Sequence, residues 1–74
     1  MINEYQVGRI SIETDSDVVT GHGTSWLTYA RAGDRIKLGE QVHLISDVLD
    51  VAHLKLTSAY TGPTLSQAQY LISK

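Results

Sequence analysis

Apolar and polar residues alternate along most of the chain, and this spacing of two predicts short β-strands separated by glycine and aspartate turns. We expect about six strands, at residues 5–14, 18–20, 35–38, 41–46, 53–57 and 69–73. The one proline, Pro63, lies outside all of them. Short strands at spacings of about ten residues favour an all-β fold, either a small SH3-like barrel, which is the first choice, or a compact β-sandwich.

The alternation changes phase within the first expected strand. Tyr5 and Val7 would lie on one face, whereas Ile10 and Ile12 would lie on the other. Glycine tolerates the backbone angles of a bulge or sharp bend. A bend at Gly8 is therefore expected to return both pairs to the same core.

The apolar positions of the later strands predict which side chains face the core. These positions are Ile36, Leu38, Val42, Leu44, Leu54 and Leu56. Ile45, Val48 and Leu49 depart from this phase and suggest a second bend or a strand that is covered on both sides. Gly39 and Glu40 between two of the strands suit a two-residue hairpin turn. His43 and His53 lie beside predicted core positions, so both are expected to point outward.

Two glycines, Gly21 and Gly23, precede Thr24 and the chain's only tryptophan, Trp26. We expect the glycines to adopt positive φ angles, which are accessible to residues without a Cβ. Thr24 would cap one short helical turn over residues 24–29. This turn would lay Trp26 and the leucine after it over an open end of the sheet.

A chain of 74 residues predicts a single domain, 1–74, whose first four residues, 1–4, would form a flexible terminus. At 8.1 kDa it should bury about 60% of the surface that the unfolded chain exposes, so its core is small. There is no cysteine, and neither a disulfide nor a cysteine zinc site can reinforce that core. Association with other chains is therefore a reasonable expectation.

The charge pattern and the lack of a long apolar run argue against two classes of partner, nucleic acids and membranes. The formal net charge is −2, and the basic residues are scattered along the chain without forming a run. We expect no nucleic-acid partner, because a groove that follows phosphates needs clustered cations. No apolar run approaches the length of a membrane span, so we expect no membrane partner either.

Three histidines, His22, His43 and His53, are the first candidates for a metal site. His43 and His53 would lie on adjacent strands and face each other across the ladder. Their spacing matches no ligand motif, however, and outward histidines on strands are usually solvated. We therefore expect no metal.

A hydrolase would need Ser25 as the nucleophile, His22 or His43 as the base, and Asp34 or Asp47 to orient that base. Nothing in the sequence places these residues together, and Ser25 lacks the following glycine of a nucleophile elbow. The glycine pair also lacks the lysine and third glycine of phosphate-binding loops. We expect no catalytic residue and no cofactor.

Trp26, together with Tyr29 or Tyr60, offers an aromatic platform for a sugar or an unstacked base. This keeps a carbohydrate- or host-surface-binding module open as an alternative function. A nucleic-acid-binding small barrel is a weaker alternative, because the electrostatics oppose it. A lone tryptophan in so small a domain more often belongs to the core.

Three motifs occur in order: T-G-x-G-T-x-W, an A-G-D turn, and L-x-L-x-x-x-Y-T-G. Their signature residues are Gly21, Gly23, Thr24, Trp26, Gly33, Asp34, Leu54, Leu56, Tyr60 and Gly62. Over residues 5–73 this combination resembles a small β module of tailed-bacteriophage structural proteins. Ala32 departs from the pattern, in which proline is common before Gly-Asp.

The resemblance implies a non-enzymatic virion protein, present in many copies as a decoration, collar, connector or fibre-attachment component. Its implied partners are other virion proteins of the capsid, neck or tail, and further copies of the same chain. The implied location is the virion, after synthesis in the cytoplasm of the bacterial host.

Overall fold

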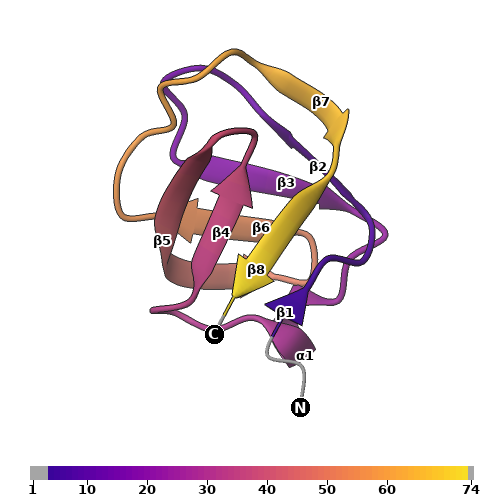
Figure 1. Ribbon diagram of the computed structural model, residues 1–74. Coiled ribbons are helices and arrows are strands. Elements are labelled where there is room, and N and C mark those ends of the chain that lie inside the picture. The colour runs from indigo at the N-terminus through magenta and orange to yellow at the C-terminus, as the bar shows by residue number, and fades with distance from the viewer. Residues whose placement is uncertain (1–3, 74) are drawn as a thin grey trace.

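The computed structural model describes residues 4–73 as eight strands and one helical turn (Figure 1). In chain order these are β1 (Glu4–Tyr5), β2 (Arg9–Ile12), β3 (Val18–His22), α1 (Trp26–Tyr29), β4 (Arg35–Leu38), β5 (Gln41–Asp50), β6 (His53–Leu56), β7 (Leu65–Ala68) and β8 (Tyr70–Ser73). The fold is all-β, as the alternation predicts. Of the expected flexible terminus, residues 1–3 lie outside the described residues. Glu4 is instead part of β1, where it pairs with Ser73.

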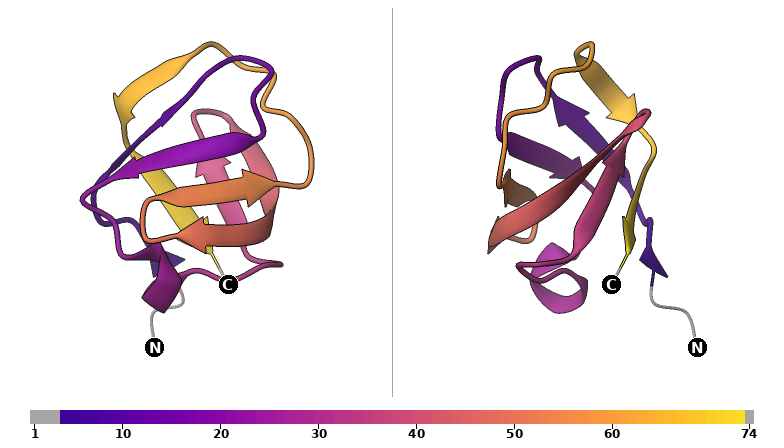
Figure 2. Two further views of the ribbon diagram at one scale, coloured as in Figure 1. Left: turned by 180° about the vertical axis from the view of Figure 1, so that it is seen from behind. Right: turned by 60° about the vertical axis from the view of Figure 1, so that its left-hand side comes forward.

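All eight strands belong to one antiparallel sheet, in the order β1-β8-β4-β5-β6-β3-β2-β7. The strands at the two ends of this order are continuous with strands inside it, since β1 leads into β2 and β7 leads into β8. Segments 4–12 and 65–73 therefore run side by side, with Tyr5 opposite Ile72 and Ile10 opposite Ala68. The sheet closes on itself as a small barrel (Figures 1 and 2).

The expected first strand is divided at Gly8, which adopts a φ of +86°. The predicted bend is therefore present, and Tyr5 packs against the core as expected. Val7 does not: its side chain is exposed. Residues 6–8 leave the strand conformation, so the alternation that assigned Val7 to the core does not apply to it.

The C-terminal segment is also divided, at Gln69 between β7 and β8, and Gln67 within β7 has a φ of +53°. The alternation predicts only its second half, which is β8. The first half, β7, pairs with β2. Its sequence, Leu65-Ser66-Gln67-Ala68, has no run of β-branched or aromatic residues, so the pattern of spacing gives no sign of it.

Among residues 4–73, thirteen apolar side chains are buried in the barrel. They are Ile10, Ile12, Val19, Trp26, Ala30, Ile36, Leu38, Ile45, Leu54, Leu56, Tyr60, Tyr70 and Ile72. The inward positions predicted for β4 and β6 are confirmed, as is the hairpin turn at Gly39, whose φ is +60°.

The predicted orientation of β5 is wrong by one residue. His43 and Ile45 point inward, with 9% and 1% of their surfaces exposed, whereas Val42 and Leu44 point outward, with 60% and 46% exposed. A shift of one residue moves every side chain of a strand to the opposite face. His43 is accommodated because Gln41 Oε1 lies 2.9 Å from its Nε2.

β5 is the longest strand and connects the two halves of the barrel. Its first part pairs with β4 and its second part pairs with β6. Register shifts between Ile45 and Asp47 and between Val48 and Asp50 mark bulges, which bend a strand and increase its twist. β5 consequently curves around the barrel, and its two ends face different directions (Figures 1 and 2).

Candidate functional site

The first signature motif holds the turn between β5 and β6 against β3 and α1. The Gly21 N–H donates to Ala52 O at 2.6 Å, and the Trp26 N–H donates to Val51 O at 3.2 Å. The Thr24 hydroxyl also donates to Val51 O, at 2.5 Å. This motif therefore fixes the hairpin turn at residues 51–52, which is distant in the sequence.

Two roles predicted for this motif are wrong. Thr24 does not cap α1, because Ser25 occupies the N-cap position and makes no side-chain cap hydrogen bond. Gly21 has no positive φ, unlike Gly23 at +73°. Gly21 is instead required for packing: a Cβ there would lie 2.5 Å from Thr24 Oγ1 and 2.8 Å from Trp26 Cη2.

Trp26 is fully buried, as predicted for a residue that closes the barrel. Its indole N–H donates to the Tyr70 hydroxyl at 3.1 Å, and that hydroxyl donates to Val7 O at 2.5 Å. The two rings meet edge to face, with centroids 5.7 Å apart. Trp26 therefore cannot stack on a ligand. Leu27, expected to cover the open end of the sheet beside it, is exposed.

Burial raises the pKa of Tyr70 to about 12, although the hydrogen bond from Trp26 acts in the opposite direction. The folded protein thus holds the phenol proton more tightly than an unfolded chain with the ordinary value of 10.0. The associated stability is complete below pH 10 and is lost as the pH rises toward 12.

Unfolding in urea at about pH 8 and about pH 11 should show this loss of stability, and Tyr70→Phe should reduce the loss. A loss of the same size in Tyr70→Phe would contradict the assignment, and Tyr29→Phe is the matched control.

The second motif anchors the loop before β4 to the middle of β5. The Gly33 N–H donates to Ile45 O at 2.8 Å, and the Ile45 N–H donates to Asp34 O at 2.9 Å. The Asp34 carboxylate accepts the Arg31 N–H at 3.0 Å. Gly33 has a φ of +95°, a conformation that favours glycine.

The third motif supplies core residues and a closing loop. Leu54 and Leu56 are buried in the barrel, and buried Tyr60 donates its hydroxyl proton to Pro63 O at 2.7 Å. A Cβ at Gly62 would lie 2.5 Å from the Tyr60 hydroxyl oxygen. All ten signature residues therefore help to build the barrel, through packing, backbone geometry or hydrogen bonds.

The three histidines do not form a metal site. His22 Nε2 lies 3.0 Å from Ser11 Oγ, and His53 Nδ1 lies 2.9 Å from Asp50 Oδ1. His43 points inward and is paired with Ile36 of β4. The prediction that His43 faces His53 is therefore wrong. Among residues 4–73, no three His, Cys, Asp or Glu side chains gather to hold a metal ion.

The hydrolase candidates are not assembled either. The Ser25 N–H donates to the Tyr5 hydroxyl at 3.0 Å, and Asp34 accepts the Arg31 N–H. His22 contacts Ser11 instead of Ser25. These hydrogen bonds join Ser25, His22 and Asp34 to Tyr5, Ser11 and Arg31, so none of them links two of the candidates.

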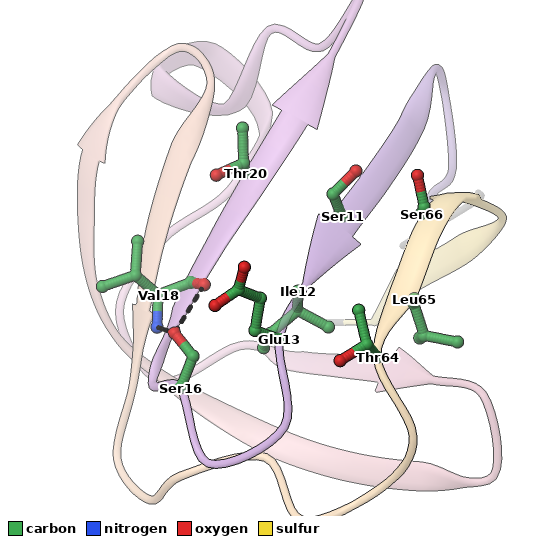
Figure 3. Close-up of a pocket in the computed structure, with 9 residues that line it drawn as sticks. All are labelled: Ser11, Ile12, Glu13, Ser16, Val18, Thr20, Thr64, Leu65 and Ser66. Carbon is green, nitrogen blue, oxygen red and sulfur yellow. Dashed lines mark hydrogen bonds between the residues drawn. The ribbon is translucent and has the colours of Figure 1, made fainter.

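A groove of about 370 Å³ crosses the outer side of β3, β2 and β7 (Figure 3). Hydroxyl groups come from five of its nine lining residues, Ser11, Ser16, Thr20, Thr64 and Ser66, and Glu13 adds a carboxylate. The remaining three are Ile12, Val18 and Leu65. The groove can exchange hydrogen bonds with a polar ligand, but its lining supplies neither an aromatic ring for stacking nor a cation.

Sequence reasoning does not find this groove. Ser11 and Thr20 are cross-strand partners of β2 and β3, and Ser66 follows on β7 beside β2. Their polar outward positions are visible in the alternation. Their alignment is not, because it depends on the pairing of β7, which the alternation does not reveal.

In the part of the chain that the structure describes, seven large apolar side chains are exposed. They are Val7, Leu27, Tyr29, Val42, Leu44, Leu49 and Val51. Single exposed apolar side chains are normal, but grouped ones mark interaction surfaces. Val42 and Leu44 share one face of β5, while Leu49 lies near its other end and Val51 follows in the turn to β6.

No helix within residues 4–73 is long and apolar enough to cross a bilayer. Comparison with protein-family models, with curated proteins and with solved structures finds no match to the chain.

Proposed function

We propose that the chain is a non-enzymatic structural component of a tailed-bacteriophage particle, present in many copies. The proposed roles are decoration, collar, connector or fibre attachment, and the proposed location is the virion. The SH3-like description of the barrel belongs to the same proposal. Its partners would be capsid, neck or tail proteins and further copies of itself.

The observation that carries this proposal is the use of the signature residues. Most of them pack in the core, leave room for a buried side chain or hold a turn, and Gly23 adopts a positive φ. A motif used in this way supports a scaffold whose surface, rather than a reactive site, performs the function. The exposed apolar side chains on that surface support contacts with other proteins.

The carbohydrate-binding alternative is less well supported. Its main feature was an aromatic platform built on Trp26, and this ring is fully buried. Tyr29 is exposed, but its ring stacks on Tyr5 with centroids 4.9 Å apart. The hydroxyl-lined groove offers hydrogen bonds without a stacking ring, which is a poor basis for retaining a sugar.

The proposal is tested on purified particles of the phage or prophage that encodes the chain. Quantitative mass spectrometry should find the chain in the particle fraction at many copies per portal complex. The matched control is the unassembled fraction of the same lysate, in which abundant non-structural proteins should remain. Absence of the chain from intact particles would exclude the proposed function, and a glycan array then tests the alternative.

A further inference from the structure

The outer face of β4, β5 and β8 combines cations with apolar side chains. The register places Lys37 between Val42 and Leu71, and Arg35 between Leu44 and Ser73. Opposite residues of an antiparallel pair lie on the same face of a sheet. We call Arg35, Lys37, Val42, Leu44 and Leu71 the basic face.

The cations of the basic face lack carboxylate partners in the described part of the chain. The ion pair found there joins His53 and Asp50 on another hairpin. Arg35 and Lys37 are exposed, and so are Val42 and Leu44 beside them. A surface that presents carboxylates next to apolar side chains would complement this face in both charge and hydrophobicity.

The opposite end of β5 presents that combination. Leu49 and Val51 are exposed there, together with Asp47 and Asp50. A hydrogen bond from the Ala52 N–H, followed by the contact with His53, lowers the pKa of Asp50 and so favours its charged form. We call Asp47, Leu49, Asp50 and Val51 the acidic hairpin.

We propose that copies of this chain associate head to tail, with the basic face of one copy on the acidic hairpin of the next. Two basic faces related by a twofold axis would bring cations together, which opposes a symmetric contact. The bulges of β5 turn its two ends in different directions (Figures 1 and 2). The basic face and the acidic hairpin of one copy therefore do not contact each other. A contact between different surfaces repeats and gives rings or filaments.

A contact of standard size would involve a substantial part of the molecular surface. A standard interface buries about 800 Å² on each partner. This is about a fifth of the 4444 Å² that the barrel exposes. The inference deepens the proposed function and rests on it, because it names the surface through which a multi-copy component would repeat.

Sedimentation of the full chain over a concentration series tests the proposal. The wild-type chain should self-associate at about 0.05 M salt and dissociate at about 0.5 M salt, because exposed charges are screened. Lys37→Glu should weaken association by about tenfold or more. Lys55→Glu makes the same change in net charge. Lys55 lies opposite Asp47, so this substitution removes a cation beside the acidic hairpin and should strengthen association instead.

A mixing experiment separates lost contacts from lost folding. Arg35→Glu/Lys37→Glu and Asp47→Lys/Asp50→Asn should each remain monomeric, whereas an equal mixture should associate, since each variant supplies the surface that the other needs. The asparagine keeps an oxygen for the Ala52 N–H. A monomeric wild-type chain, equal weakening by Lys37→Glu and Lys55→Glu, or a mixture that stays monomeric would overturn the inference. So would a basic face that binds only another particle protein, anionic vesicles or nucleic acid.

The two proposals fail separately. A chain that is abundant in particles but monomeric in solution at every concentration retains the proposed function and loses the head-to-tail contact. A chain that associates as described but is absent from particles retains the contact and loses the function.

Discussion

Replacing Trp26 with alanine should lower the free energy of unfolding by about 3–5 kcal/mol. Trp26 is the largest fully buried side chain of the barrel, and its loss leaves a cavity and removes the hydrogen bond to Tyr70. Domains of this size have a total stability of about 4–11 kcal/mol, at about 0.05–0.15 kcal/mol per residue. The variant should therefore be partly or wholly unfolded at 37 °C.

The effect is best measured by urea unfolding followed by circular dichroism, because the substitution removes the only tryptophan fluorophore. Leu27→Ala is the matched control: it removes a neighbouring apolar side chain that is 57% exposed. That variant should change stability by no more than about 0.5 kcal/mol. Similar losses in both variants would show that Trp26 does not close the barrel.

Gly8→Ala should cost about 2–5 kcal/mol, combining backbone strain with a steric collision. The φ of +86° disfavours any residue that carries a Cβ. That Cβ would also collide with the carbonyl oxygen of His22 and lie 2.9 Å from that of Gly23. Both obstacles are backbone atoms, which cannot move aside as a flexible side chain would.

Gly23→Ala is the control for Gly8→Ala. Gly23 has a similar φ of +73°, but a Cβ added there would meet no atom of the described residues within 4 Å. It should cost only the strain, about 1–2 kcal/mol. The difference between the two variants, measured by thermal unfolding, reports the collision alone. Equal losses would mean that residues 6–8 shift away from β3 without penalty.

The sequence predicts most of the fold because alternation and turn residues agree over much of it. Leu54 and Leu56 of β6, and Ile36 and Leu38 of β4, alternate with polar residues and are assigned to the core correctly. β5 has apolar residues in both phases, Val42 and Leu44 in one and Ile45 in the other. Local spacing cannot choose between them. The choice follows from long-range contacts, such as the hydrogen bonds of Ile45 with Gly33 and Asp34.

The errors in the first motif have a similar origin. Thr24 has the residue type of an N-cap, but its hydroxyl donates to Val51, which is distant in sequence. Gly21 is needed because Trp26 packs against it, not because of its own φ. Neither contact follows from local residue preferences. The basic face is likewise hidden in the sequence, since it requires the register of three strands.

The pairing of β1 with β8 also determines how the barrel would respond to mechanical load. Glu4 lies opposite Ser73, so the described chain begins and ends on neighbouring antiparallel strands (Figure 1). A force that separates these two ends acts along the hydrogen bonds between the strands, which lie perpendicular to the strand direction. The bonds would then open one after another, as in unzipping, rather than share the load in shear. A barrel of this topology should therefore withstand tension poorly when it is pulled apart at Glu4 and Ser73.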